Sequence, residues 1–406
     1  MAQLFQQPLF ARLSRLASGT AFGQQWLLRR LIQAHSYPIT VTQNQFAGPG
    51  WALLEQAVQT SQAVLVGEDH GTAQIPLFTA ALAQLLHPAL FVAEVDAYQV
   101  QDLRTLAQST ASPTAYLQQH PGSLSFYSWV AEFELVRRLL DRQVAIVGID
   151  HVFLASSGRF FTRLANAVQS PAFQQYLREL AHTCQAQDSA SLLQNTPDFA
   201  LFTLPAATIA QLLMLAQPED ARVQAMIQDY AASHAIYQGQ LQGSGGHQQR
   251  VNLLKRNLLH ELQRHQQATH GPLLPQTLVK MGALHVARNL SPLVSGGYYD
   301  VGSLISNLAE AQSHTSLHLF VVGKQGNKTA GAYAEHEVAY TAEAAPAFLR
   351  YFLGQATTQW NITDLRPLRD AWLSSQLRIN DQNLLRTVLG YDFLIVLPET
   401  TASGIY

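Results

Sequence analysis

Ionisable side chains gather at four points of the sequence where a short apolar run ends. They are Glu68, Asp69 and His70, then Glu94 and Asp96, then Asp150 and His151, and finally His285. Imidazoles and carboxylates suit either a histidine general base oriented by a carboxylate or a divalent metal that activates water. No serine lies in a G-x-S-x-G context, and the single cysteine excludes an intrachain disulfide and a Cys-ligated zinc cluster. Any metal would have to be held by His, Asp and Glu.

The elements that must position these groups are strands. Six β-rich runs predict strands at residues 63–66, 90–93, 144–147, 277–281, 317–322 and 393–397. The first run is followed by Ile75, Phe78, Leu82 and Leu85 at helical spacing, which completes a βα unit. We therefore expect an α/β fold with a mostly parallel central sheet flanked by helices. In such folds ligands bind beyond the carboxyl ends of the strands, where the ionisable groups should converge.

A helical segment interrupts the strands. From about residue 156 to 271 the sequence is rich in Gln, Ala and Leu, with helical patterns at 171–185, 206–216, 221–240 and 247–267. We divide the chain into an N-terminal part of the α/β core (1–155), a helical insertion (156–270) and a C-terminal part of the core (271–406). The insertion is expected to form one wall of the cleft.

Composition narrows the classes of partner. The 406 residues are 48% hydrophobic and 13% charged, which excludes disorder. Lys and Arg number 25 against 27 Asp and Glu, so the chain lacks the charge of a nucleic-acid binder. No apolar run reaches the roughly 20 residues that span a bilayer, and residues 1–30 do not resemble a signal peptide. We expect a cytoplasmic protein with a small-molecule substrate and no membrane partner; the sequence leaves the oligomeric state open.

Structural roles compete with functional ones at several positions. Asp69 could cap the helix that begins near Thr72. Asp96 and His151 are the weakest site candidates because each adjoins a stronger one. Lys280 is interpreted as a solvated lysine of an edge strand, and most histidines other than 70, 151 and 285 as solvent-facing. The segment 323–328 lacks the residue order of a phosphate-binding loop and is predicted to be a surface loop.

The motifs also follow the order of a known family. Gly67-Glu-Asp-His-Gly-Thr72, Ala93-Glu-Val-Asp96 and Gly148-Ile-Asp150 together resemble the motif series of the erythromycin esterase family. Further matching segments are Trp129-Val-Ala-Glu132, Arg250 with Asn257, Val279-Lys-Met-Gly-Ala-Leu-His-Val286, Asp364-Leu-Arg-Pro-Leu-Arg369 and the strand from Tyr391 to Ala402. The resemblance runs from about Val64 to Ala402.

Two departures place the chain between branches of the wider superfamily. One residue separates Glu68 from His70 where the esterases have two, and Gly282 replaces the first histidine of the family's H-N-A-H motif. Gly67-Glu-Asp-His70 and Gly282-Ala-Leu-His285 are thereby two G-x-x-H motifs. Such motifs are typical of the related Tiki/TraB-type metalloproteases and ChaN-like haem-uptake proteins.

The resemblance implies a hydrolase that acts on an ester, lactone or amide carbonyl. In this interpretation His70 takes a proton from water, Glu68 or Glu94 orients its imidazole, and His285 and Arg250 polarise the carbonyl. The family motifs add substrate-binding candidates: Asp150, Glu132, Asn257 and Asp96. The leading hypothesis needs no cofactor.

Two alternatives remain open. In the first, Glu68, His70, Glu94 and His285 hold a divalent ion such as Mn²⁺, Co²⁺ or Zn²⁺, as the two G-x-x-H motifs favour. In the second, the protein is a ChaN-like haem binder without catalytic activity, although no C-x-x-C-H motif is present.

Overall fold

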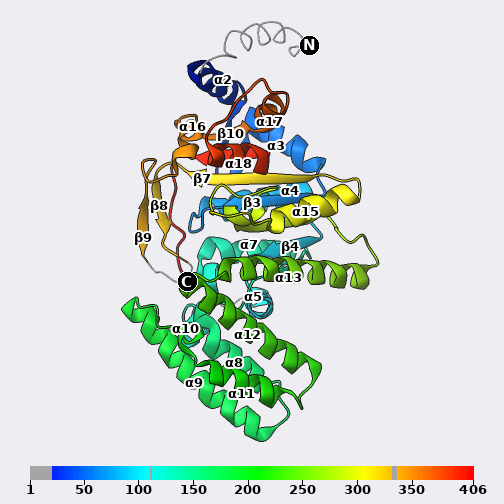
Figure 1. Ribbon diagram of the computed structural model, residues 1–406, viewed down its shortest axis with the longest axis vertical. Helices are drawn as coiled ribbons and strands as arrows, with labels where there is room; N and C mark the ends of the chain where they lie inside the picture. The colour runs from blue at the N-terminus through cyan, green and yellow to red at the C-terminus, as the bar shows by residue number, and fades with distance from the viewer. Residues whose placement is uncertain (1–20, 110–111, 332–335) are drawn as a thin grey trace.

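The computed structural model describes residues 21–109, 112–331 and 336–406 (Figure 1). Most of the N-terminal segment in which no signal peptide was recognised therefore lies outside the described residues. No helix in the described part is both long enough and apolar enough to cross a membrane.

Within the described residues, nine strands form one sheet in a mixed α/β fold. In spatial order they are β2 (Gln45–Ala47), β1 (Ser36–Thr42), β10 (Trp360–Asp364), β11 (Phe393–Leu397), β7 (Ser316–Gly323), β3 (Ala63–Glu68), β6 (Thr277–Gly282), β4 (Leu90–Ala93) and β5 (Ala145–Gly148). The strands from β11 to β5 run parallel, whereas β10, β1 and β2 join antiparallel at one edge. The expected mostly parallel α/β sheet is confirmed.

Each of the six predicted strands is present, and the others were missed for local reasons. Strand β10 reads Trp-Asn-Ile-Thr-Asp and lacks a continuous apolar run, while β1 contains Pro38. Both belong to the antiparallel part of the sheet, in which β10 lies between β1 and β11 and β1 between β2 and β10. The predicted surface loop at 323–328 is partly strand, because β8 (Gly326–Thr329) pairs with β9 (Glu337–Tyr340) in a separate hairpin.

The sheet is covered on both faces because its strands alternate between two apolar cores. Val64, Val66 and Leu278 face one core, whereas Leu65, Val279 and Met281 face the other. The first face is covered by α3 (Pro49–Gln59), α4 (Gln74–Leu86), α5 (Ala97–Gln108), α6 (Thr114–Gln119) and α7 (Val130–Asp141). The second is covered by α2 (Ala21–Ala34), α13 (Gly246–Thr269), α14 (Ala283–Val286), α15 (Val301–Ala311), α16 (Arg350–Leu353), α17 (Arg366–Leu373) and α18 (Gln382–Gly390), with the short η3 (Ala347–Leu349).

A third apolar core lies outside the sheet, within a group of helices in the lower part of Figure 1. Its elements are η2 (Leu154–Ser156), α8 (Ser157–Ala165), α9 (Pro171–Gln194), α10 (Ala200–Thr203), α11 (Ala206–Ala216) and α12 (Ala221–Leu241). These helices interrupt the strand sequence between β5 and β6. Helix α13, at the end of the same stretch, leaves this group and packs Leu254, Leu258 and Leu262 on the sheet.

The carboxyl ends of four neighbouring strands position the site. Glu68 ends β3, Glu94 directly follows β4 and Asp150 follows β5. Strand β6 leads into α14, which carries His285. Since β3, β6, β4 and β5 are adjacent and parallel, these side chains lie along one edge of the sheet.

Candidate active site

His70 lies between two carboxylates. Its Nδ1 is 2.8 Å from Glu68 Oε1, and its Nε2 is 3.5 Å from Glu94 Oε2. The ring stacks on Phe126 of the 3-10 turn η1 (Ser125–Ser128), with 4.0 Å between ring centroids. Burial alone would lower the pKa of His70, but the hydrogen bond and charge of Glu68 and the charge of Glu94 raise it above 6.5. Its side chain remains 26% exposed, so water can reach it.

Glu68 is held by a lysine that sequence analysis placed at the surface. Lys280 lies in the central strand β6, is 4% exposed and donates to Oε1 of Glu68 and, at 2.6 Å, to Oε1 of Glu132. The interpretation of Lys280 as a solvated edge lysine is wrong, because β6 is flanked by β3 and β4 and has both faces covered. Burial raises the pKa of Glu68, but Lys280 and His70 outweigh it and lower that pKa.

Glu132 is the second partner of Lys280. It lies in the first turn of α7, 1% exposed. Burial and the negative charge of Glu68 raise the pKa of Glu132 to about 7. The attraction of Lys280 lowers this pKa, but it offsets the two raising effects only in part. One ammonium thus serves two buried carboxylates, and Glu132 is the one that takes up a proton more easily. Its contacts with Lys280 place it behind Glu68, as support for the site.

Glu94 is surrounded by donors. Its Oε2 accepts the backbone N–H of Gly282 at 2.5 Å, and its Oε1 accepts Nη2 of Arg250 at 2.8 Å. Nε2 of His285 lies 3.3 Å from the same Oε1. Burial would raise the pKa of Glu94, but His285, His70 and Arg250 hold it well below its usual range. Glu94 is therefore ionised at neutral pH.

His285 is fully enclosed. Its Nδ1 donates to Oδ2 of Asp300, the residue that caps α15, at 2.8 Å. Burial lowers the pKa of His285, but Glu94 and the Asp300 hydrogen bond outweigh it and raise that pKa to about 9. The side chain is 0% exposed and is not part of the cavity wall described below, so it supports Glu94 from within the protein.

Arg250, from the first half of α13, links Glu94 to Asp150. Besides Glu94 it binds both carboxylate oxygens of Asp150, through Nε at 3.1 Å and Nη2 at 2.5 Å. Asp150 also accepts Nδ1 of His151 at 2.5 Å. Its pKa is lowered well below the usual range, since Arg250 and His151 outweigh burial. The arrangement joins Glu94, Arg250, Asp150 and His151 into one network.

Other candidate residues have partners away from this network. Asp96 caps α5 and pairs with Arg159 at 3.3 Å, while Asn257 donates to the carbonyl of Ile149 at 2.9 Å. Both act as structural links in this arrangement. Asp69 does not cap a helix: it pairs with Lys328 of β8 at 2.8 Å, which ties the hairpin to the loop that carries His70.

A cavity of about 190 Å³ opens beside Glu94 and Arg250. Helix α12 contributes Tyr237 and Gln240 to its wall, so the helical segment between β5 and β6 borders the site. Its further lining residues are Val95, Gln99, Ser125, Phe126, Asp150, His151 and Phe153. Of the predicted site residues, Glu94, Asp150 and Arg250 line the cavity. The others are not among its lining residues: Glu68, His70, Asp96, Glu132, Asn257 and His285.

Each carboxylate that could bind a metal already contacts a cation of the protein, although each cation is shared with a second carboxylate. Glu68 contacts Lys280, and Glu94 contacts Arg250 and the protonated His285. In the described part of the chain, no group of three or more His, Cys, Asp or Glu side chains is arranged to hold a metal ion. A metal at Glu68 or Glu94 would compete with these cations.

Sequence analysis missed Lys280, Asp300 and Phe126. The signal for Lys280 was present, because it is a single charge within an apolar strand that directly precedes a G-x-x-H motif. Asp300 follows an irregular Gly-rich segment and Phe126 lies in a 3-10 turn, so neither has a periodic pattern that indicates its position.

Comparison with known proteins establishes the fold. No protein-family model matches the chain, and no curated protein matches it by sequence. Among solved structures, a variant of the erythromycin esterase EreC in its open conformation matches with a TM-score of 0.58 at 15% identity, over 91% of this chain and 98% of that one. A structural-genomics protein from Bacillus cereus matches with 0.58 at 14%, over 93% and 98%.

A succinoglycan biosynthesis protein also matches, with a TM-score of 0.58 at 15% identity, over 96% of this chain and all of that one. The three structures are covered almost from end to end, so the likeness concerns the whole architecture. The resemblance expected from the motif series is confirmed at the level of the fold: the chain has the erythromycin esterase-like α/β fold.

Proposed function

We propose that the protein is a metal-free hydrolase that uses His70 as a general base on an ester, lactone or amide carbonyl. The observation that carries the proposal is the position of His70, whose partly exposed ring lies between the buried carboxylates of Glu68 and Glu94. An ionised carboxylate only accepts hydrogen bonds, so Glu68 fixes the proton of the neutral ring on Nδ1. Nε2 then has the lone pair that accepts a proton from water.

The reaction follows from this tautomer. His70 Nε2 takes a proton from water while the water oxygen attacks the carbonyl carbon. Glu68 and Glu94 stabilise the imidazolium, which returns the proton to the leaving oxygen or nitrogen as the carbon–heteroatom bond breaks. Arg250, 19% exposed, is the cation placed to stabilise charge on the carbonyl oxygen, while enclosed His285 positions Glu94.

The absence of a metal is part of the proposal. A metal bound to Glu68 or Glu94 would have to displace Lys280, Arg250 or His285, each of which already contacts one of these two carboxylates. Elemental analysis of the purified protein, together with activity before and after chelation, tests this point. Stoichiometric metal and loss of activity on chelation would refute it.

The direct test is hydrolysis of a panel of esters and lactones by the unmodified protein, His70→Ala and Glu94→Gln. Removal of a well-placed general base should reduce kcat by about 10²–10⁴-fold. His314→Ala, at an exposed position outside the network, serves as the control and should retain full activity. Full activity of His70→Ala would refute the proposed role.

A further inference from the structure

Gln99 is buried without partners for its side chain. It lies in the first turn of α5, is 0% exposed and lines the cavity beside Arg250. Neither Nε2 nor Oε1 has a hydrogen-bond partner among the described residues, although its backbone N–H is bonded to Asp96. Buried polar groups are almost always hydrogen-bonded, because each unpaired one costs its desolvation free energy.

His151 adds a second unpartnered group to the same cavity. Its Nδ1 is fixed by Asp150 at 2.5 Å, whereas its Nε2 is buried and has no hydrogen-bond partner in the described part of the chain. The ring packs against Tyr237, with 4.6 Å between centroids, and lines the cavity. Gln99 comes from α5 and His151 from the loop after β5, so two independent elements place residues with unpaired polar atoms in the wall of one cavity.

Carboxylates outnumber cations around the cavity. Glu94 and Asp150 share Arg250, and the protonated His285 lies between Glu94 and Asp300. An anionic ligand group would be repelled here, and Gln99 has no charge to pair with a cationic one, so a neutral polar group fits best. Gln99 offers one acceptor oxygen and an amide that donates, and a hydroxyl group can both accept and donate.

The cavity has a volume of about 190 Å³ and is partly open to solvent, so it can receive a hydroxyl-bearing part of a larger molecule. Glu94 lines the same cavity, and its Oε2 lies 3.5 Å from Nε2 of His70, so Glu94 connects a group bound there with the proposed general base.

We propose that Gln99 and His151 form a subsite for a neutral, hydroxyl-bearing group, and that the substrates are esters of small polyols or sugars. The assignment of an ester substrate rests on the proposed hydrolytic function; the binding of a polyol does not. A site with groups that pair with a substrate hydroxyl discriminates strongly against an analogue that lacks it, because those groups are then left buried and unpaired.

Binding is tested without turnover. Saturation-transfer NMR measures the binding of glycerol, D-ribose and cyclopentanol, the last of which is a ring of similar size to ribose with a single hydroxyl group. The measurement compares the unmodified protein with Gln99→Leu and His151→Asn. The polyols should bind at least tenfold more tightly than cyclopentanol, and each variant should lose this preference. In His151→Asn the amide retains a donor for Asp150 while the distal nitrogen is removed. Equal binding of cyclopentanol, or unchanged polyol binding in both variants, would overturn the proposal.

Stability separates a recognition role from a structural role for Gln99. If the amide of Gln99 is paired only when a ligand is bound, it is unpaired in the unliganded protein. Gln99→Leu then replaces unpaired buried polar atoms with apolar ones and should raise the Tm of the unliganded protein. A fall in Tm would mean that the amide stabilises the fold, which contradicts the subsite.

Hydrolysis links the subsite to the proposed reaction. The ratio of kcat/KM for glyceryl monobutyrate to that for butyl butyrate should exceed tenfold and fall toward one in Gln99→Leu. If polyols bind but neither ester is cleaved, the proposed function fails and the subsite stands. If both esters are cleaved at equal rates, the subsite fails and the hydrolase stands.

Discussion

Lys280 sets the charge balance around His70. Two buried carboxylates face one ammonium, and burial raises the pKa of Glu132 to about 7 while Lys280 lowers that of Glu68. Glu132 is therefore protonated before Glu68, and Glu68 stays ionised next to Nδ1 of His70. Lys280 acts through Glu68, and its role is to position and polarise rather than to contact substrate.

Replacement of Lys280 by Met should impair both the reaction and the fold. Removal of one partner of a buried pair typically costs about 3–5 kcal/mol. Since the charge of Lys280 lowers the pKa of His70, its loss should shift the acidic limb of the pH–rate profile to higher pH. Denaturant unfolding and pH–rate profiles measure the two effects.

Two companion variants separate these effects. Lys280→Arg keeps the charge and should keep the acidic limb near its original pH. Lys280→Met combined with Glu132→Gln removes one charge of each sign and should recover part of the stability. An acidic limb that does not move in Lys280→Met would show that Lys280 has no electrostatic effect on His70.

The pKa values of the two site histidines predict a bell-shaped pH profile. His70 acts as a base only when neutral, so activity should fall as the pH decreases through its pKa, which is raised above 6.5. His285 holds Glu94 only when protonated, so activity should also fall as the pH rises through about 9. Because the Asp300 hydrogen bond raises the pKa of His285, Asp300→Asn should move the alkaline limb to lower pH. An unmoved alkaline limb would assign that limb to another group.

At the scale of elements, the glycines of the two G-x-x-H motifs have different roles. A Cβ at Gly67 would lie 2.5 Å from Cγ2 of Val286 and 2.9 Å from Cα of Ala283, so Gly67 allows α14 to pack on β3. A Cβ at Gly282 would instead meet Nε2 of His70 at 3.1 Å and Oε2 of Glu94 at 3.5 Å. The first glycine serves packing, and the second leaves space beside the proposed base.

Alanine substitutions should separate these roles. Gly67→Ala should destabilise the protein by about 1–3 kcal/mol, as overpacking does. Gly282→Ala should cost little stability, because its φ of −50° suits alanine, but it should displace His70 and lower kcat at least tenfold. Thermal unfolding and ester hydrolysis are the measurements. Equal loss of stability in both variants would contradict the distinction.

Local sequence patterns determine which parts of the architecture can be predicted from the sequence. Parallel strands buried on both faces are continuous apolar runs, so β3, β4, β5, β6, β7 and β11 could be recognised, and with them the edge at which the ionisable groups meet. The sequence could not indicate that β6 lies between β3 and β4, because this pairing depends on tertiary contacts. The burial of Lys280 follows from that position, which is why its role was misjudged.

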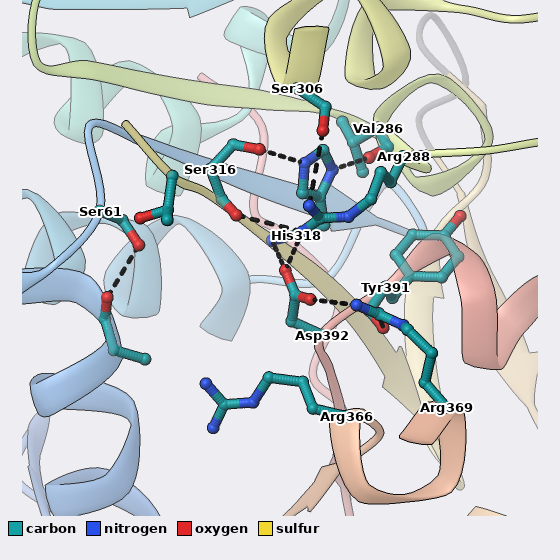
Figure 2. Close-up of polar contacts among 12 residues, drawn as sticks. Ser61, Val286, Arg288, Ser306, Ser316, His318, Arg366, Arg369, Tyr391 and Asp392 are labelled. Atoms are coloured by element: carbon teal, nitrogen blue, oxygen red, sulfur yellow. Dashed lines mark hydrogen bonds and ion pairs between the residues drawn. The ribbon is translucent and has the colours of Figure 1, made fainter. Parts of the chain in front are cut away.

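At the scale of the whole molecule, the sheet has a second buried polar cluster near the amino ends of β7 and β11 (Figure 2). Asp392, directly before β11, accepts the backbone N–H of His318 at 2.9 Å and binds Arg288 and Arg369 at 2.6 and 3.1 Å. His318, the third residue of β7, is 0% exposed, so its interpretation as solvent-facing is wrong. A histidine within an apolar strand has no local signal for such a cluster.

His318 is neutral in the folded protein. Its Nδ1 donates to the carbonyl of Val286 at 2.7 Å, so Nε2 accepts from Oγ of Ser316 at 2.8 Å. Burial and the charge of Arg288 lower the pKa of His318 to about 4. The cluster joins β7, β11 and the segment after α14, and it tolerates an uncharged imidazole but not a charged one.

Stability should therefore fall in mildly acidic solution. Below about pH 6.5 the unfolded chain binds a proton at His318 that the folded protein does not bind until about pH 4, so the free energy of unfolding decreases as the pH falls through this window. For this fully buried group, the gap between the two pKa values corresponds to about 3 kcal/mol. His318→Asn retains a donor for Val286 but does not titrate. Urea unfolding of both proteins from pH 4 to 7.5 should show a smaller loss in the variant; parallel curves would mean that His318 does not contribute to acid sensitivity.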